Sequence, residues 1–103
     1  MNYSIIWSPS AYATFEERIY YLQTNWTEKE IANFTTRVKE YLEVLKGEPL
    51  IGKRTGKRKN VHTGLIIKEV SLLYRIKPIK KEIELLVFFD NRQNPKKIRK
   101  YQV

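Results

Sequence analysis

A polar segment able to contact an anion directly follows the most apolar stretch of the chain. The run IELLVFF at 83–89 leads into DNRQNPKK at 90–97. An arginine held just beyond a strand end can form paired hydrogen bonds to a phosphate. Asp90 could orient the Arg92 guanidinium, or could cap the following turn, as aspartate commonly does. Arg92, Lys96 and Lys97 are therefore candidate binding residues, with a purely structural turn fixed by Pro95 as the alternative.

A second group of cations lies in the segment GKRTGKRK at 52–59. Attraction to a phosphate backbone depends mainly on charge density, so this segment could bind RNA or DNA without sequence specificity. A solvated surface loop is the alternative. The candidate binding residues outside the 90–97 segment are Lys53, Arg54, Lys57, Arg58, Lys68 and Arg75.

His62 is the only histidine and a candidate general base or acid. Cleavage of RNA by its own 2′-hydroxyl requires a base, an acid and a positive group near the phosphate. One histidine cannot be both base and acid, which excludes a two-histidine ribonuclease. His62 could still act with Lys59 and Arg92. The alternative is an ordinary strand histidine without a chemical role.

The sequence lacks the residues that several other kinds of functional site require. The chain has no cysteine, so it forms neither disulfides nor thiolate sites. The four acidic residues after position 50 form no D-x-D or H-E-x-x-H motif, which argues against a metal-dependent nuclease. No glycine-rich phosphate-binding motif is present, and we expect no cofactor. Because no apolar run approaches the roughly 18 residues of a membrane span and no signal peptide is recognisable, we expect a cytoplasmic protein without a membrane partner.

The positive charge is concentrated in one half of the chain. Residues 1–50 carry five basic and seven acidic residues, a net charge of −2. Residues 51–103 carry fifteen and four, a net charge of +11. This asymmetry favours an anionic partner such as a nucleic acid, a ribosome or an acidic protein segment. The alternative is that the cations only keep a small domain soluble.

Hydrophobic spacing predicts one strand and two helices in the first half. Residues 3–7 alternate as in a strand, and Ser8-Pro9 is a typical helix start. Apolar residues then follow at helical spacing: Ala11, Phe15, Ile19, Leu22 and Trp26. Thr27 and Glu30 form a capping box for a second helix, which Gly47 and Pro49 end. The short connection predicts an antiparallel helical hairpin.

The second half predicts a loop at 47–59 followed by strands. The apolar parity changes between residues 65–67 and 70–76, which indicates a turn or bulge near Lys68-Glu69. A polar turn at 78–81 precedes a last strand at 82–89, whose nearly continuous apolar character predicts an interior position. The expected fold is α+β, in the order β-α-α-β-β-β. We expect an antiparallel sheet with the helical hairpin on one face, and residues 1–103 as a single domain.

Together these segments resemble a known family. IIWSPSAYATFEERIYYLQTNW, LKGEPLIGKR, SLLYRI and IELLVFFDNRQNPKK are similar, in this order, to the RelE/ParE superfamily of toxins, which includes plasmid stabilisation proteins. The resemblance implies a bacterial growth inhibitor from a type II toxin–antitoxin module. It also implies a cognate antitoxin that wraps an acidic or amphipathic segment around the toxin, giving a hetero-oligomer.

The superfamily divides by target. RelE-like members cut messenger RNA on the ribosome without a metal, whereas ParE-like members act on DNA gyrase. By this resemblance Arg92 matches the RelE-type arginine after the last strand. Ser71 stands where another arginine is expected, and Ile98 stands where a tyrosine is expected, with Tyr101 nearby.

These departures and the long hairpin containing Trp26 favour the gyrase branch. The first alternative is a ribosome-dependent endoribonuclease that uses the candidate catalytic residues Arg92, His62, Lys59 and Tyr101. The second is a non-toxic basic module that only binds nucleic acid.

Overall fold

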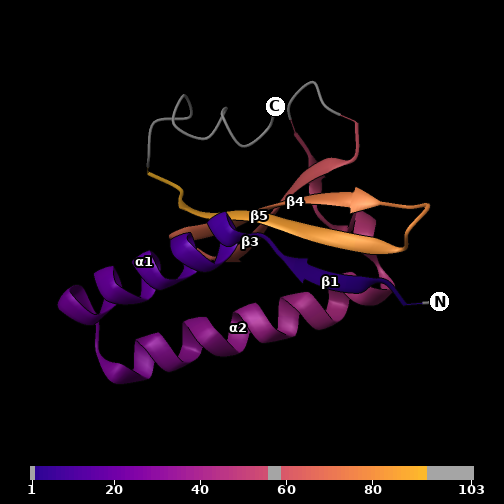
Figure 1. Ribbon diagram of the computed structural model, residues 1–103. Helices are drawn as coiled ribbons and strands as arrows, with labels where there is room; N and C mark the ends of the chain where they lie inside the picture. Colours follow the sequence, from indigo (N-terminus) through magenta and orange to yellow (C-terminus); the bar gives the residue numbers. More distant parts are fainter. Residues whose placement is uncertain (1, 56–58, 93–103) are drawn as a thin grey trace.

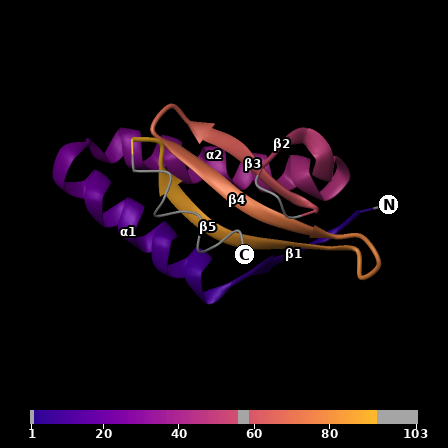
Figure 2. The ribbon, with the colours of Figure 1, turned by 90° about the horizontal axis from the view of Figure 1, so that it is seen from above.

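Two helices cover one face of a five-stranded sheet (Figure 1). The computed structural model describes residues 2–55 and 59–92. The elements, in chain order, are β1 (Ser4–Trp7), α1 (Pro9–Asn25), α2 (Glu28–Gly47), the 3-10 helix η1 (Pro49–Ile51), β2 (Lys53–Arg54), β3 (Val61–Ile67), β4 (Val70–Lys77) and β5 (Glu82–Asp90). The strands lie in the order β1-β5-β4-β3-β2, as Figure 2 shows from the side opposite the helices. The predicted α+β class and helical hairpin are confirmed.

Both helices begin at the predicted caps. The Ser8 hydroxyl accepts a hydrogen bond from the Ala11 amide at 3.0 Å. Thr27 and Glu30 form the reciprocal capping box, in which the Glu30 carboxylate accepts from the Thr27 amide at 3.1 Å. Each side chain satisfies a backbone donor that the first helical turn leaves without a partner. Neither helix is long and apolar enough to cross a membrane, within the part of the chain that the structure describes.

The sheet differs from the expectation in two details. β1 pairs in parallel with β5, from Ser4 opposite Glu82 to Trp7 opposite Leu85, so the sheet is mixed and not wholly antiparallel. Alternation of apolar residues reveals a strand but not its direction, and the intervening helices and strands provide the long connection that a parallel pair requires. Lys53 and Arg54 form β2 on the edge of β3, where a loop was expected.

The remaining strand predictions are confirmed. β3 and β4 are joined by a turn at Lys68-Glu69, and their register shifts between Leu65 and Ile67, which accounts for the change of parity. β5 lies between β1 and β4 and is therefore an interior strand. Its side chains enter two apolar clusters. Leu85 and Phe88 belong to the cluster beneath the helices, whereas Leu86 and Val87 belong to a smaller cluster on the opposite face.

Tyr74 joins the segment after α2 to the sheet. Its buried hydroxyl donates to the Pro49 carbonyl at 2.8 Å and accepts from the Gly52 amide at 3.0 Å. Burial raises the pKa of Tyr74, so its hydroxyl stays protonated and can donate. Tyr74 is therefore a core residue, and the position of β2 depends on its hydroxyl.

Gly64 provides a test of the packing between α2 and β3. A β-carbon at this position would overlap the hydroxyl and ring of Tyr41 on α2, whereas a β-carbon at Gly47 would meet nothing within 4 Å. We expect Gly64→Ala to lower the free energy of unfolding by about 1–3 kcal/mol, as overpacking does. Gly47→Ala should be neutral or stabilising by about 0.4–1 kcal/mol. Urea unfolding of both variants measures the difference, and equal stability of the two would contradict this packing.

Candidate functional site

A charged cluster lies where β5 ends against α1. We call Arg18, Tyr21, Asp90 and Arg92 the Asp90 cluster. One carboxylate oxygen of Asp90 accepts from the Arg92 amide at 2.7 Å and from its Nε at 3.1 Å. The other accepts from Arg92 Nη2 at 2.9 Å and lies 3.5 Å from Arg18 Nη1. Asp90 therefore both closes the turn and orients Arg92, which the sequence had offered as alternatives.

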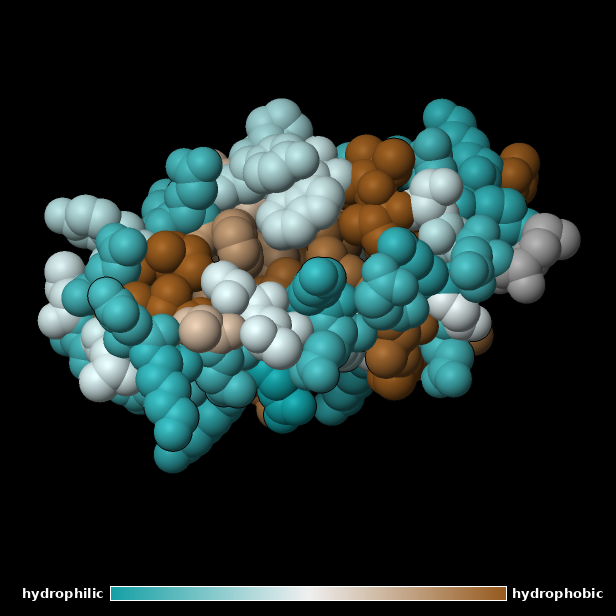
Figure 3. Space-filling view, turned by 90° about the horizontal axis from the view of Figure 1, so that it is seen from below, coloured by the Kyte–Doolittle hydropathy of each residue, from teal (hydrophilic) through white to brown (hydrophobic). Residues whose placement is uncertain are grey.

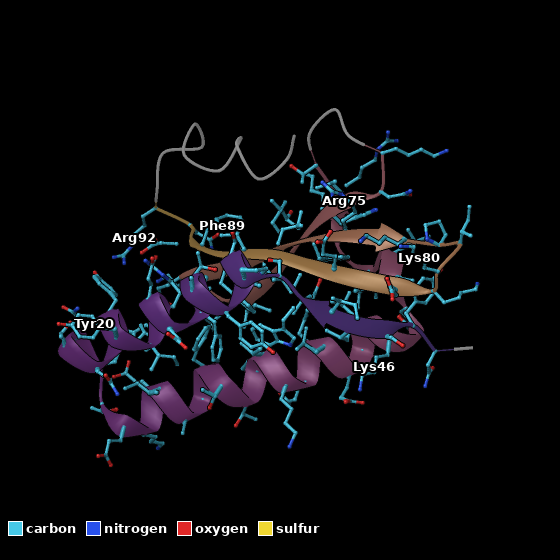
Figure 4. The ribbon with its side chains drawn as sticks, viewed as in Figure 1. Tyr20, Lys46, Arg75, Lys80, Phe89 and Arg92 are labelled. Carbon is cyan, nitrogen blue, oxygen red and sulfur yellow. The ribbon has the colours of Figure 1, made fainter. Side chains whose placement is uncertain are left out.

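The charges of the cluster stabilise one another. The hydrogen bonds from the Arg92 side chain, more than any other contact, hold the pKa of Asp90 below its usual value. The same pairing raises the pKa of Arg92. Tyr21 accepts a long hydrogen bond of 3.4 Å from Arg92 Nη2, and the Arg18 guanidinium lies 5.8 Å from the centre of the Tyr21 ring. The Arg92 guanidinium therefore faces α1 (Figure 4).

Hydrogen bonds fix the strand end on two sides. The Phe88 amide donates to the Thr14 hydroxyl at 2.9 Å, which ties β5 to α1. On the other side the Asn91 amide donates to the Glu69 carbonyl at 2.8 Å, and the Asn91 side chain donates to the Lys68 carbonyl at 2.9 Å. The cluster is consequently held between a helix and the β3–β4 turn, both of which belong to the folded body.

A cavity of about 190 Å³ adjoins the Asp90 cluster. It is lined by Arg18, Tyr21, Leu22, Asn25, Trp26, Glu69, Val70, Asp90 and Arg92. A larger groove of about 490 Å³ lies between the start of α2 and the β3–β4 turn, and Trp26 and Glu69 line both spaces. Figure 3 shows the helix-covered side, where apolar surface is exposed in separate areas between hydrophilic side chains.

Within the described residues, the predicted catalytic residues His62 and Arg92 lie apart. His62 is only 7% exposed, stacks on the Tyr74 ring at 5.7 Å and has its Nδ1 3.3 Å from the Gly52 carbonyl. His62 pairs with Tyr74, whereas Asp90 pairs with Val70, four residues away along β4. That separation is about 13 Å at the usual rise per strand residue. Lys59, two residues before β3, lies toward the His62 end, and Tyr101 falls outside the described residues.

The predicted binding residues are divided between the two ends of the sheet. Lys53 and Arg54 lie exposed on β2, and Arg75 lies opposite Val61 at the same end. Lys68 lies in the β3–β4 turn, where its carbonyl accepts a hydrogen bond from Asn91, the residue before Arg92. Arg75 and Lys77 share the carboxylate of Glu84, at 3.4 and 3.7 Å, so part of their charge is neutralised. Lys57, Arg58, Lys96 and Lys97 are outside the described residues.

Sequence reasoning missed Arg18 and Tyr21. Arg18 lies three residues after Phe15 and four before Leu22, within the apolar stripe of α1. A charged residue at a stripe position is the signal that was available, because such a side chain must find a partner when the helix packs. Within residues 2–55 and 59–92, no group of three or more potential metal ligands occurs.

Neither a comparison with protein-family models nor one with curated proteins finds a match. Solved structures do match. The chain is similar to the RelBE2 toxin–antitoxin complex of Mycobacterium tuberculosis, at 17% identity and a TM-score of 0.63, over 88% of this chain and 100% of that one. It is similar to the chromosomal ParDE system of P. aeruginosa, at 19% identity and a TM-score of 0.67, over 85% and 95%.

The isolated E. coli RelE toxin also matches, at 12% identity and a TM-score of 0.63, over 97% of this chain and 96% of that one. This chain has the RelE/ParE fold. The RelE/ParE fold was expected from the sequence resemblance, and the match extends over nearly all of both chains. At these identities the similarity concerns the fold, and side-chain roles must be argued from this chain's own residues.

Asp90→Asn tests the charge pairing within the RelE/ParE fold. The Asp90 side chain is 12% exposed. Losing its charge should lower stability at pH 7 by about 1–3 kcal/mol. The pKa of Asp90 is lower in the folded protein than its unfolded value of 3.8, so the ionised carboxylate stabilises the fold at pH values above 3.8. This stabilisation is lost as the pH falls through the folded-state pKa. We therefore expect the difference in stability between the two proteins to shrink as the pH falls below 3.8, in urea unfolding measured from pH 7 to pH 2.5.

Glu43→Gln is the matched control for this measurement. It removes a carboxylate from an exposed pair with Lys46, where the expected change is below about 1 kcal/mol. An Asp90→Asn effect as small as that of the control, or one independent of pH, would contradict the proposed pairing.

Proposed function

We propose that this protein is the toxin of a type II toxin–antitoxin module and that it inhibits growth by acting on DNA gyrase. The fold supports the first part, since the matching structures are described as toxins or toxin–antitoxin complexes. A cognate antitoxin would neutralise the toxin in a hetero-oligomer. Gyrase acts on DNA in the bacterial cytoplasm, so the proposal places the protein there.

One observation carries the choice of gyrase over messenger RNA. The Arg92 guanidinium is hydrogen-bonded to Asp90 and faces α1, on the helix side of the sheet. His62 is buried on the same side but at the other end. Cleavage would require these groups to converge on one phosphate. Their separation within the described residues supports a toxin that acts by binding a protein.

The outer surface of the hairpin is suited to such binding. α1 exposes Tyr12, Tyr20 and Tyr21, and tyrosine is among the residue types that dominate protein–protein binding energy. Tyr20 projects from α1 near the end of the hairpin (Figure 4). The hairpin is therefore the surface of this chain that we assign to gyrase contact.

Induced expression without antitoxin tests the choice of target. Separate labels follow DNA and protein synthesis in a bacterial culture. We expect DNA synthesis to fall first and a DNA-damage response to follow, because a poisoned gyrase blocks replication. Prompt loss of protein synthesis with DNA synthesis intact would contradict gyrase and support the ribosome. An unaffected culture would contradict a toxic function altogether.

Tyr20→Ala tests the assignment of the hairpin. Truncating a central aromatic contact usually weakens binding by more than about 1 kcal/mol, or more than about fivefold. We expect growth inhibition to require several-fold more protein, with unchanged thermal stability because Tyr20 is exposed. Ile79→Ala is the control, since Ile79 is exposed in the β4–β5 turn. Equal inhibition by both variants would contradict the assignment of the hairpin to the target-binding surface.

Ribosome-dependent RNA cleavage is the second candidate, and the cations near β2 favour it. Lys53 and Arg75 lie at the same end of the sheet as Lys77, and Glu84 neutralises only part of this charge. If this surface binds RNA, the affinity should fall steeply with salt, and Arg75→Gln should reduce the slope by about 1. Binding of single-stranded RNA at several salt concentrations measures this, and a slope unchanged by the substitution would exclude Arg75 from the contact.

A further inference from the structure

We propose that the cavity beside the Asp90 cluster is a carboxylate-binding subsite that receives an acidic group of a partner polypeptide. Identifying that partner as the antitoxin rests on the proposed function, whereas the binding chemistry rests on the residues of the cavity. Three properties support the assignment: an unsatisfied donor, a charge imbalance and the connection to the neighbouring groove.

The first property is a buried donor without an acceptor. Arg18 Nε is buried and has no hydrogen-bond partner within the described residues. Native proteins pair nearly all such groups with protein, water or ligand. Arg92 uses its amide, Nε and Nη2 for hydrogen bonds in the described structure, and its Nη1 has none there. Both arginines can thus donate further hydrogen bonds.

The second property is an excess of positive charge. Arg18 and Arg92 share one buried carboxylate, that of Asp90, so among the described residues two arginines form ion pairs with a single acid. Glu69 also lines the cavity and is partly buried, but among the described residues it forms no ion pair with Arg18 or Arg92. A singly charged carboxylate would neutralise the excess. A doubly charged phosphate would exceed it and would be repelled by Asp90 more strongly than a carboxylate is.

The charge of Arg18 is poorly hydrated, which strengthens its attraction to a ligand. The Arg18 side chain is only 14% exposed, and the Leu22 and Val70 side chains contribute apolar surface to the cavity. Electrostatic attraction is greater in such surroundings than in water. The planar guanidinium fork also matches the geometry of a carboxylate.

The third property is the neighbouring groove, in which the rest of the ligand can lie. The cavity volume of about 190 Å³ suits a carboxylate on a short side chain rather than a whole folded element. Because Trp26 and Glu69 also line the larger groove, a chain anchored at the Asp90 cluster can continue there. Within that groove Trp26 and Ile67 offer apolar contact. The expected partner segment is therefore acidic with an adjacent apolar residue.

Nuclear magnetic resonance titration of the purified, isotopically labelled protein tests this subsite. The probes are N-acetylglutamic acid α-amide, which has only a side-chain carboxylate, N-acetylglutamine, which has only a terminal one, and inorganic phosphate. All are added at constant ionic strength, with sodium chloride as the reference. We expect a saturable shift of the Arg18 Nε–H resonance with a carboxylate, and weaker binding of phosphate.

The two carboxylate probes distinguish the sources of the group. Tighter binding of the first assigns the subsite to an internal acidic residue, and tighter binding of the second assigns it to a chain terminus. A shift no larger than that caused by chloride would overturn the proposal. Tighter binding of phosphate would also overturn it.

Arg18→Lys tests the role of the guanidinium, because it keeps the charge but removes the fork. We expect at least tenfold weaker carboxylate binding, whereas Arg75→Lys, at the opposite end of the sheet, should bind as the unmodified protein does. Equal binding by Arg18→Lys would overturn the assignment. If that variant does not fold, Arg92→Lys replaces it, with the same expectation and the same overturning result. These titrations use no antitoxin and no growth assay, so their failure is distinct from failure of the proposed function.

Discussion

β5 must be shielded from water on both faces and paired along both edges. Its apolar run supplies side chains to two clusters on opposite faces of the sheet. β4 covers one edge and β1 the other. Because β1 runs parallel to β5, the chain between them has to cross over, and the helical hairpin lies in that connection. The position of the helices thus depends on the pairing that β5 requires.

The same constraint determines where the charged cluster forms. α1 is joined to β5 through Thr14, and Asn91 joins the strand end to the β3–β4 turn. Asp90 therefore lies in a buried position beside Arg18. An unpaired carboxylate there would raise the free energy of the folded state. Arg92 completes the pairing by turning back toward α1. Its direction is thus a consequence of how Asp90 is neutralised.

Signals from neighbouring residues in the sequence were sufficient to predict the helices but not the functional site. Ser8, Thr27 and Glu30 act within a few residues of their own position, so their capping roles could be predicted from spacing alone. The parallel direction of β1 and the convergence of Arg18 with Asp90 depend on contacts between residues far apart in sequence. His62 illustrates the difference: its strand was predicted, but its stacking on Tyr74 placed it away from Arg92. A histidine near cations in sequence need not lie near them in space.

The kind of partner that the basic second half of the chain favours differs between the sequence and the folded protein. As a sequence, a charge of +11 over residues 51–103 favours a nucleic acid. In the described structure, Asp90 pairs with Arg92, and Glu84 pairs with Arg75 and Lys77, so these cations form mixed clusters with acids. A regular polyanion would meet Asp90 and Glu84 as well as the cations. A polypeptide that offers one carboxylate among apolar residues would meet complementary groups around Trp26, while the remaining charge would accelerate its approach. Among the described residues, the distribution of charge therefore favours a protein partner over a nucleic acid.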